Sequence, residues 1–147
     1  MDDADFDIHD FLPYLLNQAG EACGLAFQKI YKQRYGMLRT EWRLLFHLGR
    51  YGEMTAKEFS QRAHMHKTKV SRAVAALEAK RFMTRDRIET DRRHESLRLT
   101  RAGEAVFQAL CIEAKTYEEK LLRQIDEEET RVLKATLRKL AGLDLDR

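Results

Sequence analysis

Residues that could contact a nucleic acid are concentrated between positions 66 and 72 of this chain. Lysine and arginine side chains can donate hydrogen bonds to guanine acceptors or to phosphate oxygens, and serine and threonine hydroxyls can contact either. The stretch offers six candidate contacts: His66, Lys67, Thr68, Lys69, Ser71 and Arg72. This composition predicts a surface that binds DNA.

An apolar pattern runs through the same stretch. Val70, Val74 and Leu77 recur at helical spacing, with Ala73 beside them, so one face of a helix over residues 67–80 is apolar and the opposite face is basic. The N-terminal residues of such a helix meet the base edges when it enters the major groove. We therefore expect a recognition helix here.

The neighbouring segments predict the rest of a winged helix-turn-helix. Thr55 and Glu58 have the spacing of a capping box, which opens a short helix over residues 56–63. The turn to the next helix is short, as in a helix-turn-helix. Residues 82–87 and 95–99 predict two strands joined by a charged tip. The Thr55 hydroxyl and the first N–H groups of its helix could hold a phosphate.

The distribution of charge supports a polyanionic partner. Residues 60–101 hold 12 lysines and arginines against 5 aspartates and glutamates, a net charge of +7. Residues 1–59 and residues 102–147 each carry −2. A basic middle third between acidic flanks is the electrostatic footprint of a nucleic-acid-binding surface.

Helices are expected on both sides of this lobe. One is expected near residues 10–36, a second helix with Thr40 as its N-cap follows, and two more span residues 101–145. No linker composition interrupts the chain, so residues 1–147 are expected to form one domain, with residues 38–100 as the DNA-binding lobe. The fold class is mainly α with a small β-hairpin wing. The flanking helices carry more apolar residues than a lone winged helix requires.

Residues 55–103 resemble the multiple-antibiotic-resistance regulator (MarR) family. The resemblance is carried by four linked motifs, Lys67-Thr-Lys-Val-Ser-Arg72, Leu77-Glu-Ala-Lys80, Asp91-Arg92-Arg93 and Leu97-Arg-Leu-Thr-Arg-Ala-Gly103. The chain departs from the family at Arg81, where many members have glycine because the backbone is left-handed.

The resemblance implies a sequence-specific transcriptional regulator, by default a ligand-responsive repressor. Arg93, with Arg92 beside it, is expected in the minor groove, where negative potential concentrates, and Asp91 is expected to hold Arg93 by an ion pair. The flanking helices are expected to form a two-fold homodimer, and the operator is then an inverted repeat.

Members of this family bind small aromatic or phenolic acids between the dimerisation helices and the DNA-binding lobe. The corresponding candidates in this chain, each of which could instead be an ordinary core residue, are Phe27, Tyr31, Trp42, Arg43, Phe46 and His47.

Two alternative functions stay open. One is a non-specific architectural DNA-binding protein, for which binding would be salt-sensitive with little sequence preference. The other is a peroxide sensor that uses Cys23, although the neighbouring Glu21 and apolar residues do not favour a reactive thiol.

Other classes find no support in the sequence. It contains no glycine-rich phosphate loop, nucleophile elbow or HExxH motif, so we expect neither an enzyme nor a cofactor. The five histidines lack metal-ligand spacing, apart from His64 and His66 in the turn. There is no run of about eighteen apolar residues and no signal-peptide pattern, so a cytoplasmic protein is expected.

Overall fold

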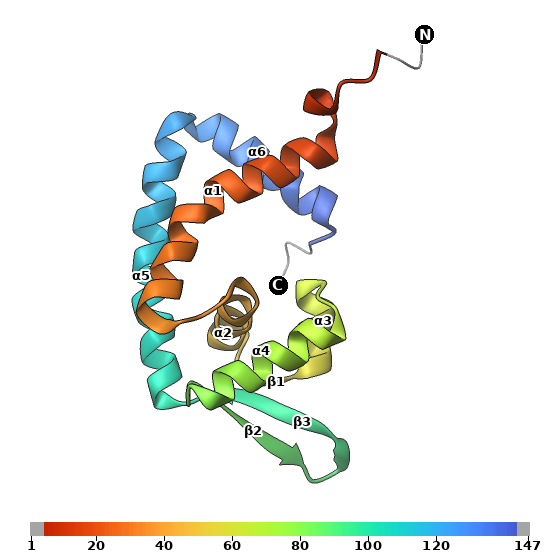
Figure 1. The fold of residues 1–147 in the computed structure, drawn as a ribbon, viewed down its shortest axis with the longest axis vertical. Coiled ribbons are helices and arrows are strands. Elements are labelled where there is room, and N and C mark those ends of the chain that lie inside the picture. Colours follow the sequence, from red (N-terminus) through yellow and green to blue (C-terminus); the bar gives the residue numbers. More distant parts are fainter. Residues whose placement is uncertain (1–4, 144–147) are drawn as a thin grey trace. The chain divides into compact units, whose positions relative to one another are not determined.

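The computed structural model describes residues 5–143, and at residues 91–93 it describes the backbone only. The elements of the chain are η2 (Ile8–Asp10), α1 (Leu12–Tyr35), α2 (Arg39–Tyr51), β1 (Met54–Thr55), α3 (Ala56–Ala63), α4 (Lys67–Ala79), β2 (Met83–Ile88), β3 (Asp91–Leu99), α5 (Arg101–Leu121), η3 (Leu122–Gln124) and α6 (Glu127–Ala141). The α-helices and the β2–β3 hairpin follow the expected order (Figure 1), whereas η2, β1 and η3 were not predicted. The expected fold class, a mainly helical winged helix with a small sheet, is confirmed.

The ends of the first two long helices follow from local chemistry. Pro13 lies in the first turn of α1, where its missing N–H leaves no bond unmade, and Gly36 ends α1 in the left-handed conformation at φ 64°. The expectation for α2 was wrong, because Thr40 lies inside its first turn. The N-cap is Leu38, whose N–H donates to the Glu41 carboxylate at 2.8 Å.

The sheet has the strand order β1-β3-β2 and is antiparallel throughout. Leu97 of β3 faces both Met54 and Arg85, whereas Ser96 faces Asp86. Since successive side chains alternate between the two faces of a sheet, Arg85 and Leu97 share the face that packs toward α4, and Asp86 lies on the opposite face. The sheet therefore presents one side to the recognition helix.

The core of the winged helix joins α2, α3, α4, the sheet and the first half of α5. Its largest fully buried side chains include Leu44, Phe59, Leu77, Leu97 and Leu110. Among the residues whose burial is described, Glu41 is the only buried charged one, and its carboxylate accepts a hydrogen bond from Lys80 Nζ at 2.9 Å. This ion pair connects the first turn of α2 to the residue that ends α4.

The connection from α4 to the sheet contains two constrained backbone positions. Arg81 has φ 63°, so the left-handed residue expected there is confirmed without a glycine. Gly103, in the first turn of α5, lies so close to the chain that an added Cβ would be 1.9 Å from the carbonyl oxygen of Phe82.

The chain divides after Ile112 into two compact units. In the second unit, Asp126 and Glu129 form the capping box that opens α6, with the Glu129 N–H donating to Asp126 Oδ1 at 2.7 Å. Lys134 of α6 contacts Glu118 of α5 at 2.9 Å. Within residues 5–143, no helix is long and apolar enough to cross a lipid bilayer.

Candidate nucleic-acid interface and pocket

The turn between α3 and α4 is held by local hydrogen bonds. His64 ends α3 at φ 51° and ψ 47°, and Met65 is buried beneath the turn. The Met65 N–H donates to the Ser60 carbonyl, and the Ser60 hydroxyl donates back to the Met65 carbonyl at 2.6 Å. His66 then caps α4, because its ring nitrogen Nδ1 accepts from the Thr68 N–H at 3.2 Å. The first turn of α4 is thereby fixed relative to α3.

The two faces of α4 are those that the sequence predicts. Its apolar residues Val70, Ala73, Val74 and Leu77 are buried against the core. The polar candidates are all exposed, and they are His66, Lys67, Thr68, Lys69, Ser71 and Arg72. Cationic and hydroxyl groups thus project from the first half of α4, which is the arrangement that base edges and phosphates require.

Only half of the predicted capping box forms at the start of α3. The Thr55 hydroxyl accepts from the Glu58 N–H at 3.1 Å, but in the described part of the chain no bond returns from the Glu58 carboxylate to Thr55. Thr55 is also the last residue of β1, where it faces Ser96 of β3. This position lies at the edge of a surface groove.

The groove has a volume of about 660 Å³ and lies between α3, α4 and the β2–β3 hairpin. Three predicted contact residues line it: Thr55, Lys67 and Ser71. The other candidates of α4 are exposed but do not line it. At the hairpin tip, Asp91 pairs with Ile88 through the backbone. The side chains of Asp91, Arg92 and Arg93 are outside the described residues, so the roles assigned to them stay predictions.

Arg85 also lines the groove, and the sequence analysis missed it. Its guanidinium makes two bonds to the Glu78 carboxylate, at 3.0 and 2.9 Å, and lies 3.8 Å from Glu95. The hydrogen bond from Arg85 holds the pKa of Glu78 below its usual value. Sequence spacing could not indicate this cluster of Arg85, Glu78 and Glu95, because its members come from one helix and two strands.

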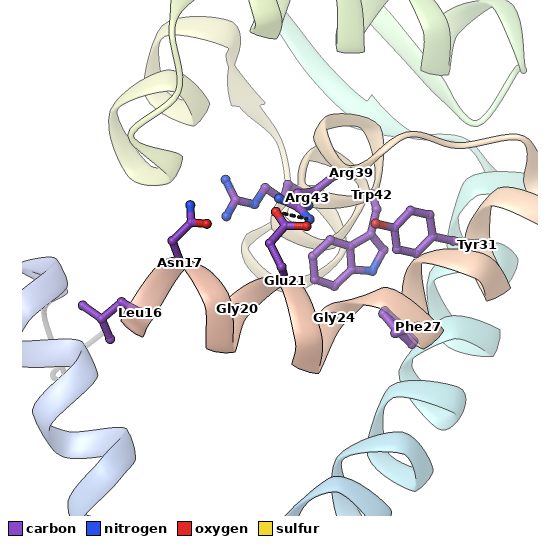
Figure 2. A pocket seen from close by; sticks show the side chains of 10 residues that line it. All are labelled: Leu16, Asn17, Gly20, Glu21, Gly24, Phe27, Tyr31, Arg39, Trp42 and Arg43. Atoms are coloured by element: carbon purple, nitrogen blue, oxygen red, sulfur yellow. Dashed lines mark ion pairs between the residues drawn. The ribbon is translucent and has the colours of Figure 1, made fainter. Parts of the chain in front are cut away.

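A second hollow, of about 330 Å³, lies between α1 and α2 (Figure 2). Four of the six predicted effector residues line it: Phe27, Tyr31, Trp42 and Arg43. The sequence analysis did not predict the remaining lining residues, which are Leu16, Asn17, Gly20, Glu21, Gly24 and Arg39. Gly20 and Gly24 leave space there, since a Cβ at either would meet no atom within 4 Å.

Phe46 and His47, the other two predicted effector residues, do not line this pocket. Phe46 packs edge-on against Phe107 of α5, with ring centroids 5.2 Å apart. His47 faces α3, where its ring lies 5.1 Å from that of Phe59, and its Nδ1 is 2.7 Å from the Arg43 carbonyl. Burial lowers the pKa of His47, and the charges of Arg62 and Arg43 lower it further.

The pocket combines aromatic faces with guanidinium groups. Tyr31 and Trp42 are stacked with their planes 6° apart, and burial raises the pKa of Tyr31. Arg39 lies 3.5 Å from Glu21 across the pocket, as the dashed line in Figure 2 marks. In the part of the chain that the structure describes, Trp42 Nε1–H is the one buried side-chain polar group without a hydrogen-bond partner. Such a donor costs about 1–3 kcal/mol unless a partner satisfies it.

The remaining candidates are placed as follows. Cys23 is exposed on α1 and Cys111 is half-buried, and neither lines the pocket. Among the described residues, no group of three or more His, Cys, Asp or Glu side chains could hold a metal ion.

Comparisons with known proteins find transcriptional regulators. A model of the MarR family matches residues 35–94. An uncharacterized HTH-type transcriptional regulator of Bacillus subtilis, YwoH, is 25% identical over 118 residues, which cover 79% of this chain and 85% of the relative. A MarR/EmrR family transcriptional regulator from Acinetobacter sp. ADP1 is 26% identical, with a TM-score of 0.82 over 93% of this chain and 96% of that protein.

Two more distant crystal structures share the fold and contain a bound partner. The S. aureus MepR–DNA complex is 22% identical, with a TM-score of 0.78 over 89% of this chain and 96% of MepR. NadR in complex with 4-hydroxyphenylacetate is also 22% identical, with a TM-score of 0.78 over 95% of this chain and 98% of NadR. At this identity the likeness establishes the fold alone.

Proposed function

We propose that this chain is a homodimeric repressor of the MarR family of transcriptional regulators, whose model matches residues 35–94. It binds an inverted-repeat operator and leaves it when a small aromatic acid occupies the pocket between α1 and α2. The observation that carries the proposal is the exposed polar face at the start of α4, beside a β-hairpin wing.

The DNA-binding half of the proposal follows from the shape of the interface. α4 enters the major groove, where Lys67, Thr68 and Ser71 reach base edges and phosphates. Lys69 and Arg72 contribute mainly phosphate contacts, since half to two-thirds of protein–DNA hydrogen bonds go to the backbone. Arg93 enters the adjacent minor groove.

Exposed apolar side chains in both terminal parts support a homodimer. On α6 they are Val132, Leu133, Leu137 and Leu140, and near the start of α1 they include Phe11, Leu12, Leu15 and Leu16. A second copy of the chain would bury apolar side chains of this kind. Two copies place two recognition helices on half-sites about one helical turn apart, which matches an inverted repeat.

The chemistry of the pocket favours an aromatic carboxylate as effector. The stacked rings of Tyr31 and Trp42 offer a flat apolar wall. Arg39 and Arg43 can bind a carboxylate, and the Trp42 N–H lacks an acceptor. The bound 4-hydroxyphenylacetate in NadR, whose fold is similar, is a compound of this class.

Selection of bound sequences from random duplex DNA at about 150 mM salt tests the DNA-binding proposal. We expect an inverted repeat that is preferred over scrambled duplex by about 10³-fold or more. Lys69→Ala should weaken binding, whereas Lys139→Ala on α6 serves as the charge-matched control. Binding without enrichment, together with a steep salt dependence, would instead indicate an architectural DNA-binding protein.

Calorimetric titration with 4-hydroxyphenylacetate and with its neutral amide tests the effector class. The acid should bind more tightly than the amide because it alone carries the charge that Arg39 and Arg43 can pair with. Arg43→Met should remove most of this preference. Equal binding of acid and amide, or no binding of either, would contradict the assignment of this pocket to aromatic acids related to the probe.

A further inference from the structure

The guanidinium of Arg85 lies between carboxylates of two different elements. Glu78 of α4 accepts two hydrogen bonds from it, and Glu95 of β3 lies 3.8 Å away. The side chains are partly exposed, at 37% for Arg85, 44% for Glu78 and 43% for Glu95. Exposed ion pairs of this kind contribute little to stability, so solvent ions or a ligand can compete for either partner.

The groove beside this ion pair is suited to a strand of DNA backbone. Lys57 and Lys67 line it together with Arg85, and the hydroxyl residues Thr55 and Ser71 line it as well. α4 and the β2–β3 hairpin lie side by side in Figure 1. A helix in the major groove and a wing in the adjacent minor groove must straddle the sugar–phosphate strand that separates the two grooves. The groove between α4 and the hairpin is where that strand would pass.

We propose that Arg85 binds a phosphate of this strand, while Glu78 and Glu95 hold its guanidinium toward the groove when DNA is absent and compete with the phosphate for it. The inference rests on the proposed function and adds a contact that the sequence did not indicate. A planar guanidinium can exchange a bidentate carboxylate for a bidentate phosphate without changing its hydrogen-bond geometry. Glu78 and Glu95 therefore lower the affinity for DNA in general.

A purely structural role for the ion pair makes the opposite prediction for Glu78. If the pair only ties the hairpin to α4, removal of either partner loosens the wing and weakens DNA binding. If Glu78 competes with phosphate, Glu78→Gln frees Arg85 and strengthens binding. The sign of the change at Glu78 therefore separates the two roles.

Salt titrations of operator binding with Arg85→Ala test the contact. We expect about tenfold weaker binding at about 150 mM salt. The slope of log K against log salt should fall by about one unit for each half-site. Arg98→Ala is the matched control, because Arg98 carries the same charge on the same hairpin but pairs with Asp86 on the opposite face. Equal effects of the two substitutions would overturn the proposal.

The Glu78→Gln variant should bind the operator about 1.5- to 5-fold more tightly, which is the range expected for loss of an exposed ion pair. Weaker binding of this variant, with unchanged thermal unfolding, would overturn the competition between carboxylate and phosphate. The unmodified protein separates this inference from the proposed function. If the unmodified protein selects no DNA sequence, the proposed function fails. If it binds selectively and Arg85→Ala leaves its affinity unchanged, only the phosphate contact is refuted.

Discussion

The ion pair between Glu41 and Lys80 offers a quantitative test of how α2 is joined to the recognition helix. The Glu41 carboxylate accepts hydrogen bonds from the Leu38 N–H and from Lys80 Nζ. The Glu41 side chain is 4% exposed, whereas the Lys80 side chain is 28% exposed. Lys80→Met removes the charge but keeps most of the apolar stem. It would leave the Glu41 carboxylate buried with only the backbone donor.

The magnitude follows from this geometry. Breaking a fully buried pair by removal of one partner costs about 3–5 kcal/mol. Water can still reach the partly exposed end of residue 80, so we expect Lys80→Met to lower the free energy of unfolding by about 2 kcal/mol. For a chain of this length that corresponds to a fall in Tm of about 4–8 °C. Glu41→Gln keeps an acceptor for Leu38 and should cost about 1–2 kcal/mol.

A double-mutant cycle with Lys80→Met and Glu41→Gln, measured by urea unfolding at fixed protein concentration, separates the interaction energy of the ion pair from the other effects of each substitution. The double variant should be more stable than the sum of the single costs indicates, by about 1–2 kcal/mol, because it contains no unpaired buried charge. Arg98→Met, at the exposed Arg98–Asp86 pair, should cost less than about 1 kcal/mol. Additivity of the cycle to within about 0.5 kcal/mol would refute the reasoning.

Three further predictions concern the backbone and one histidine. Arg81→Gly should raise the free energy of unfolding by up to about 1 kcal/mol, since φ is 63° there, and an unchanged or lower Tm would contradict this. Gly103→Ala should cost about 3 kcal/mol or more, because its Cβ would meet the Phe82 carbonyl at 1.9 Å, and near-native stability in urea would show that the close approach is absent. Burial lowers the pKa of His47 in the folded state, so its contribution to stability is complete above the unfolded pKa of about 6.5 and is lost as pH falls through the lower folded pKa. His47→Gln should therefore lose less stability than the unmodified protein between about pH 7.5 and pH 5, and parallel pH curves would exclude this role.

The order of the elements and the two faces of α4 could be predicted from the sequence because periodicity reports which side of a helix is apolar. The left-handed residue after α4 could also be predicted, although an arginine occupies it. The N-cap of α2 could not be predicted. Glu41 supplies the capping group from within the helix and is paired with Lys80, a residue 39 positions away.

Sequence reasoning selected only some of the residues that line the pocket, because the two walls are formed in different ways. Trp42 and Arg43 of α2 are large side chains that sequence reasoning selects, whereas Gly20 and Gly24 contribute to the pocket by having no side chain. His47 does not line the pocket because the packing of α2 against α3 directs its ring toward Phe59, and periodicity does not report that packing.

The position of Trp42 gives the protein an optical probe of its own pocket. It is the only tryptophan in the chain, and it lies in the pocket stacked on Tyr31, with an indole N–H that lacks an acceptor. Light that excites tryptophan but not tyrosine would excite this residue alone, so the tryptophan emission of the whole protein reports one wall of the pocket. A ligand that enters should quench or shift that emission without any label, and unknown effectors can be screened by fluorescence before any operator is known.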